Sequence, residues 1–195
     1  MARATRFLII AFVLGVATPA IAQGTPGWVR FVAGAVSSVL VHEAGHVTAA
    51  AVLGGSPSVG FDRARPVVYS GLDPALDPDA QFVFSASGMS VQLLLNEALL
   101  AWPHETGEPA GPLERGVLAG GIGTVLFYFT IGRSASVSDV QQMAQYSGLS
   151  KWTLGAMFGG VAALEAVRIW RSDRYGPHFF VLPGPERTVR VGVAY

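Results

Sequence analysis

The sequence predicts an all-α membrane protein with about four transmembrane helices after an N-terminal signal sequence. Two observations lead to this fold class. Of the 195 residues, 51% are hydrophobic and only 13% are charged, whereas soluble domains have roughly 25% charged residues. The apolar residues also gather in stretches that approach the roughly 20 residues needed for a helix to cross a bilayer.

Four apolar stretches follow the signal sequence, and each predicts one helix. Tryptophans lie at the edges of these stretches, at positions 28, 102, 152 and 170. Tryptophan is enriched where a membrane protein meets the lipid headgroups, so this spacing favours spanning helices over the core of a soluble protein. The stretches run from about Trp28 to Gly54, Ala80 to Trp102, Arg115 to Gly132 and Lys151 to Trp170.

The segments between these stretches are polar and rich in turn-forming residues. In the first loop, Val67-Val68-Tyr69 predicts a short strand or hairpin. A short amphipathic helix is expected to begin near Asp139. Apolar and polar residues alternate from Val189 to Tyr195, which predicts a short strand at the C-terminus.

The first 22 residues read as a signal peptide. Arg3 and Arg6 precede an apolar segment from Phe7 to Val16, and Ala20-Ile21-Ala22 matches the A-x-A pattern of a cleavage site. We expect cleavage after Ala22, which leaves residues 23–195 as a single membrane-embedded domain. The alternative is an uncleaved anchor that adds one further span.

The composition excludes several classes of site and partner. The chain has no cysteine, so disulfides and thiolate zinc sites are excluded, and a metal must be held by His, Asp or Glu. The 13 basic and 13 acidic residues balance, and no basic field indicates nucleic acid as a partner.

The segment His42-Glu43-Ala44-Gly45-His46 carries the strongest functional signal. Residues four apart lie on one face of a helix, so both imidazoles can reach one zinc ion. Glu43 then lies beside the open position, where it can take a proton from water and pass it to a leaving amine. Histidines and a glutamate within an apolar span are costly unless they are used.

The segment from His42 to Gly54 resembles the first signature of the site-2 protease family of intramembrane zinc metalloproteases, H-E-x-G-H-x-x-x-A-x-x-x-G. Residues Gly88 to Gln92 have the spacing of that family's G-P-x-x-N element, but they lack its proline and have glutamine in place of asparagine. The family's third ligand is an aspartate after the third span. The resemblance implies that Asp139 is this ligand.

Other interpretations of the acidic residues stay open from the sequence. Asp139 can instead be a helix N-cap, and Glu97 in the second stretch is the rival third ligand. Glu165 lies three residues before Arg168, which predicts an ion pair within one helix.

Together these features predict an integral protein of the bacterial inner (cytoplasmic) membrane. We expect it to cut a peptide bond of a membrane-anchored protein substrate with Zn²⁺ held by His42, His46 and Asp139 and with Glu43 as the catalytic base. The alternative is a catalytically inactive relative that serves as a membrane-embedded binding or assembly protein.

Overall fold

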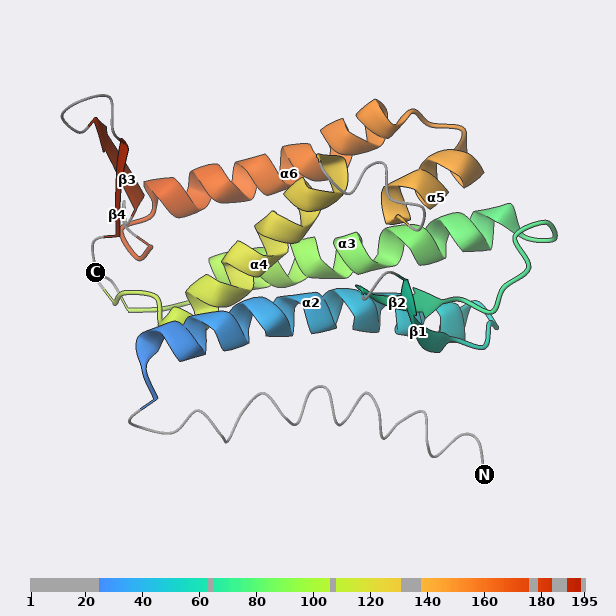
Figure 1. Ribbon diagram of the computed structural model, residues 1–195, viewed down its shortest axis with the longest axis horizontal. Helices are drawn as coiled ribbons and strands as arrows, with labels where there is room; N and C mark the ends of the chain where they lie inside the picture. Colours follow the sequence, from blue (N-terminus) through green and yellow to red (C-terminus); the bar gives the residue numbers. More distant parts are fainter. Residues whose placement is uncertain are drawn as a thin grey trace.

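The computed structural model describes residues 25–62, 65–105, 108–130, 138–175, 179–183 and 189–193 (Figure 1). The predicted signal peptide, residues 1–22, lies outside the described residues.

The described chain is mainly helical, and its helices confirm those predicted from the sequence. Two helices begin with side-chain caps, because Asp77 accepts a hydrogen bond from the Ala80 N–H and Ser150 accepts one from the Thr153 N–H. One helix begins three residues earlier than predicted, at Pro112, since proline suits the first turn. The helices are α2 (Gly27–Val52), α3 (Pro78–Ala101), α4 (Pro112–Phe129), α5 (Asp139–Ser147) and α6 (Lys151–Arg171).

Two antiparallel hairpins complete the described structure. The first joins β1 (Ser58–Asp62) to β2 (Arg65–Tyr69) and confirms the β element predicted in the first loop. The second joins β3 (Phe179–Pro183) to β4 (Val189–Val193) and confirms a C-terminal β element. The sequence predicted β4 from its alternation but did not predict its partner β3.

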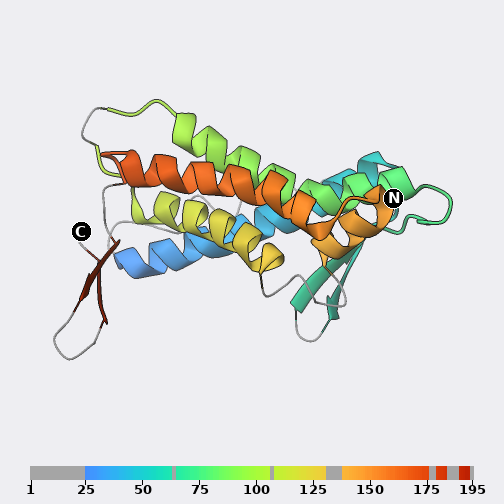
Figure 2. The same cartoon turned by 90° about the horizontal axis from the view of Figure 1, so that it is seen from above.

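The helices α2, α3 and α6 run along the longest axis of the molecule, and α4 crosses obliquely between them (Figures 1 and 2). α2 and α4 begin at the end where α3 and α6 finish, and α5 lies near the opposite end, beside the start of α3. α2 packs against both α3 and α4. This arrangement brings α5, which follows the third predicted span, toward the half of α2 that carries the histidines.

Glycines allow α2 and α4 to approach until their backbones touch. A Cβ atom added at Gly34 would lie 2.1 Å from the Leu113 carbonyl oxygen, and one at Gly116 would lie 2.0 Å from the Phe31 carbonyl oxygen. Close backbone contact through small residues is the usual way in which helices associate in a bilayer. The glycines therefore fix the distance between these two helices.

Two of the described helices, α3 and α6, are long and apolar enough to cross a membrane. α2 is long, but the two imidazoles and the Glu43 carboxyl interrupt its apolar character. α4 has 18 residues and carries Glu114 and Arg115 in its first turn. Length and composition thus support spanning segments at α3 and α6.

Candidate metal centre

α2 directs both histidines of the sequence motif into the protein. The side chains of His42 and His46 come from successive turns, and the residues are 1% and 3% exposed. The backbone of α3 lies directly against them at Gly88, where an added Cβ would fall 2.4 Å from His46 Nε2 and 2.8 Å from His42 Nε2. The absence of a side chain at this position gives the imidazoles their room.

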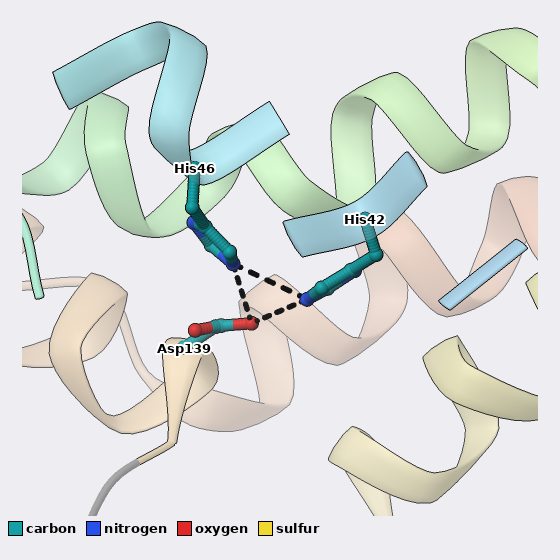
Figure 3. Close-up of side chains that lie close together, drawn as sticks. All are labelled: His42, His46 and Asp139. Atoms are coloured by element: carbon teal, nitrogen blue, oxygen red, sulfur yellow. Dashed lines mark hydrogen bonds and ion pairs between the residues drawn. The ribbon is translucent and has the colours of Figure 1, made fainter. Parts of the chain in front are cut away.

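Asp139 completes a group of three convergent side chains (Figure 3). Its Oδ2 atom lies 3.0 Å from His42 Nε2 and 3.2 Å from His46 Nε2, and the two Nε2 atoms are 3.2 Å apart. Ligand atoms placed around a tetrahedral zinc ion at 2.0–2.1 Å lie about 3.3 Å from one another. The triangle is therefore close to one face of a zinc coordination tetrahedron.

The surroundings of His46 leave its Nε2 atom without a proton in the neutral ring. The Nδ1 atom lies 2.8 Å from the carbonyl oxygen of Phe84. A carbonyl can only accept, so Nδ1 carries the hydrogen and donates it. A neutral imidazole has one N–H, and Nε2 therefore presents a lone pair toward Asp139.

His42 is oriented in the same way through a chain of two polar side chains. Its Nδ1 atom lies 3.3 Å from Gln92 Oε1. The orientation of the Gln92 amide is fixed by its nitrogen, which donates to the Ser38 carbonyl at 3.2 Å and to the Ser38 hydroxyl at 2.9 Å. Gln92 Oε1 is thus an acceptor, so His42 Nδ1 donates and its Nε2 is bare.

Two bare imidazole nitrogens and a carboxylate oxygen thus face one another at about hydrogen-bond distance. Three acceptors so arranged repel unless a positive charge lies among them. The group can hold a metal ion, or in its absence a shared proton. His ligands whose second nitrogen donates to a neighbour are typical of zinc centres.

Comparisons with protein-family models, curated proteins and solved structures found no match to this chain.

Two alternatives that the sequence left open concern the cap position of α5 and the rival carboxyl group of Glu97. Asp139 is the first residue of α5, and the preceding residue, Ser138, occupies the cap position. The Asp139 carboxylate is instead directed to the two histidines. Glu97, the rival third ligand, pairs with Arg168 and does not belong to the group formed by His42, His46 and Asp139.

The predicted ion pair between Glu165 and Arg168 within α6 is wrong. Arg168 pairs with Glu97 on α3 instead, and Glu165 accepts a hydrogen bond from Asn96. The i,i+3 spacing permits the intrahelical pair, but packing of α3 beside α6 offers each side chain a different partner. Local spacing could not reveal this exchange.

A groove of about 560 Å³ opens beside the three convergent side chains. Glu43 lines this groove together with His42, His46 and Asp139. Most of the other lining residues are apolar and come from α2 and α4, with contributions from β2 and α3; among them are Phe31, Val32, Val36, Val39, Val67, Phe84 and Phe127. Glu43, the acidic residue of the motif, thus lies beside the metal-binding group and lines the apolar groove.

A relay of amides and hydroxyls fixes α5, and hence Asp139, against α3. Ser70 Oγ donates to Gln81 Oε1 at 2.9 Å, and Gln81 Nε2 donates to Gln142 Oε1 at 3.1 Å. Ser85 Oγ also lies 3.1 Å from Gln142 Oε1. Gln142 lies one turn after Asp139, so these bonds hold the turn that carries the carboxylate. The sequence gave no signal for this relay, because its members come from separate segments.

Replacement of Gln92 tests the orientation of His42. Gln92→Leu keeps a similar volume but removes the acceptor for His42 Nδ1, so the ring can adopt the other tautomer. We expect zinc affinity to fall about 10–100-fold, as for other outer partners of metal ligands. Titration with zinc against a competing chelator measures the change, and Gln145→Leu, at an exposed glutamine of α5, is the control that leaves the surroundings of His42 and Asp139 in place. Equal affinities of wild type and Gln92→Leu would contradict the assigned role.

Proposed function

We propose that the protein is an intramembrane zinc metalloendopeptidase that hydrolyses a peptide bond of a membrane-anchored substrate. The observation that carries this proposal is the convergence of His42, His46 and Asp139, with Glu43 beside them, on one apolar groove. Two histidines, a carboxylate and an adjacent glutamate form the set of groups that zinc-dependent hydrolysis requires.

The chemistry follows from the position of each group. His42, His46 and Asp139 would hold the zinc ion, which would supply Lewis-acid polarisation of a carbonyl group and a lowered pKa, about 7, for a bound water. Glu43 takes the proton from the attacking water and then gives it to the amine that leaves, so one carboxyl acts first as base and then as acid.

Gln142 is suited to hold the substrate carbonyl. Its Oε1 atom is occupied by Gln81 and Ser85, and its amide nitrogen has no partner among the described residues. Gln142 lines the same groove as Glu43 and Asp139. Its amide therefore offers an oriented N–H donor to a peptide oxygen beside the reacting bond, where developing negative charge is stabilised by such donors.

The groove favours an apolar substrate segment. Several of its α2 side chains are strongly exposed, such as Val32 at 49% and Val36 at 53%. A groove bordered by exposed valines and by phenylalanines binds apolar side chains. The backbone of an unwound substrate segment needs the polar groups at the base of the groove. A transmembrane segment of another protein combines both properties.

The surface of α6 supports membrane insertion. Trp152 and Trp170 are 75% and 69% exposed at its two ends, about 27 Å apart along a helix that rises 1.5 Å per residue. The hydrocarbon core of a bilayer is about 30 Å thick. Trp28 and Trp102, also about two-thirds exposed or more, lie at the end of the molecule where α6 finishes. We propose the bacterial inner membrane as the location.

Glu43→Gln separates hydrolysis from metal binding. The protein is expected to stay in the membrane pellet after alkaline carbonate extraction, and it is then purified and reconstituted with a pool of fluorophore-labelled single-span peptides. Wild type should cleave peptides in a zinc-dependent manner, and Glu43→Gln should lower the rate about 10²–10⁴-fold by loss of the general base. Both proteins should contain equal zinc.

Glu97→Gln is the matched control, since Glu97 lies outside the groove and should leave the rate unchanged. If wild type contains zinc and cleaves no peptide of the pool, the alternative of an inactive binding or assembly protein is favoured. Equal cleavage by wild type and Glu43→Gln would contradict the proposed mechanism.

A further inference from the structure

A second buried polar pair lies between α3 and α6, apart from the metal centre. Asn96 on α3 and Glu165 on α6 are both completely buried. The Asn96 Nδ2 atom donates a hydrogen bond to Glu165 Oε2 at 2.8 Å. A carboxyl group with no exposed surface, on a helix that can cross a membrane, requires an explanation in terms of its charge.

One oxygen atom of each side chain, outside this bond, has no partner among the described residues. These atoms are Asn96 Oδ1 and Glu165 Oε1, and both are buried. If Glu165 is ionised, each of these atoms is an acceptor and neither can satisfy the other. Buried polar atoms without partners are rare in proteins because they are costly. If Glu165 is a carboxylate, the pair therefore lacks one hydrogen atom that could join Glu165 Oε1 to Asn96 Oδ1.

Glu165 forms no ion pair with a positive group among the described residues. The nearest cation along α6, Arg168, pairs with Glu97 of α3, and both of these side chains are more than two-fifths exposed. At Gly121, α4 presents no side chain to Asn96, since a Cβ added there would lie 2.5 Å from Asn96 Oδ1. Charge on Glu165 would thus face an uncharged amide, a glycine and, farther out, an ion pair that is already neutral.

We propose that Glu165 is a proton-binding site, held as a neutral carboxylic acid in a cyclic pair with the Asn96 amide. A proton on Oε1 makes that atom a donor to Asn96 Oδ1, while Oε2 continues to accept from Nδ2. One proton therefore satisfies both orphaned atoms, and no other bond changes. The pair then joins α3 to α6 through two hydrogen bonds without burying a charge.

A metal cation suits this site poorly. Hard cations such as Ca²⁺ and Mg²⁺ take six or more oxygen ligands, and this pair offers two free oxygens. The proton is thus the ligand that the donor set fits. The inference is independent of the proposed peptidase activity, because neither residue belongs to the metal-binding group.

Infrared difference spectroscopy of the full chain in lipid tests the proposal. The spectrum of wild type minus Glu165→Gln at pH 7 should contain the carbonyl band of a protonated carboxylic acid, shifted in D₂O. Glu97→Gln removes a carboxylate of α3 that pairs with Arg168 of α6. The spectrum of wild type minus Glu97→Gln should therefore contain carboxylate bands only. Carboxylate bands in place of the acid band for Glu165 would overturn the proposal. A Glu165 band that shifts on addition of Na⁺ or Ca²⁺ at constant pH would also overturn it, because the ligand of the site would then be that cation.

Thermal unfolding gives a second readout. In the unfolded chain the Glu165 carboxyl ionises above about pH 4.3, whereas the folded state keeps the proton. The free energy of unfolding therefore falls as the pH rises above this value. The melting temperature of wild type should fall from pH 5 to pH 9 by several degrees more than that of Glu165→Gln, whose amide needs no proton. Equal pH dependence in the two proteins would contradict the proposal, and addition of a chelator should leave the difference between them unchanged.

Discussion

Replacement of His42 or His46 by alanine is expected to abolish stoichiometric zinc binding. Each imidazole supplies one corner of the triangle with Asp139, and two remaining protein ligands rarely hold zinc, since zinc sites in proteins have at least three. Elemental analysis of the detergent-purified protein should give about one zinc ion per chain for wild type and close to none for His42→Ala or His46→Ala.

The same experiment distinguishes the third ligand. Asp139→Ala should weaken zinc binding greatly. Asp139→Asn should weaken it less, because the amide oxygen can still act as an uncharged metal ligand. If the carboxyl had only a capping role, both variants would keep their zinc. Glu97→Ala should have no effect, since that carboxyl is engaged by Arg168.

His104 provides the matched histidine control. It is exposed, and its Nδ1 atom bonds to the Trp102 carbonyl oxygen at 2.9 Å. His104→Ala should therefore bind zinc like wild type. Comparable zinc in His42→Ala and wild type would mean that the buried histidines have only a packing role, and it would remove the basis of the proposed activity.

Gly88→Ala is expected to disrupt the metal centre without removing any ligand. The added methyl group would lie 2.4 Å from His46 Nε2 and 2.8 Å from His42 Nε2, so either α3 moves away from α2 or both rings leave their positions. Zinc affinity should fall by at least about 100-fold, and overpacking of this kind costs about 1–3 kcal/mol of stability. Chelator competition and thermal unfolding measure the two effects.

Gly159→Ala is the control for the intrinsic effect of the substitution. An added Cβ at Gly159 on α6 meets nothing within 4 Å, and alanine favours the helix over glycine by about 1 kcal/mol. This variant should be as stable as wild type or more so, with unchanged zinc affinity. A Gly88→Ala protein that behaves like Gly159→Ala would show that the rings do not rest against α3 as described.

The sequence by itself determined the elements that depend on local pattern. Apolar stretches predicted the four long helices to within a few residues, and alternation predicted β4. The spacing of His42 and His46 placed both imidazoles on one face, because four residues nearly complete one helical turn. The role of Glu43 was predicted from its position next to His42 in the same motif. These features need only the geometry of a single helix or strand.

Only the tertiary structure decided which side chains meet across helices. The order of Asp139 along the chain suggested a ligand, but its approach to the histidines depends on how α5 packs against α3. Gln92 and Gly88 serve the site through the crossing of α2 and α3. Arg168 pairs with Glu97 and not with Glu165. Glu165 accepts a hydrogen bond from Asn96 instead. Such pairings depend on the rotation and relative height of neighbouring helices, which are set by packing over their whole length and not by the spacing of residues within one of them.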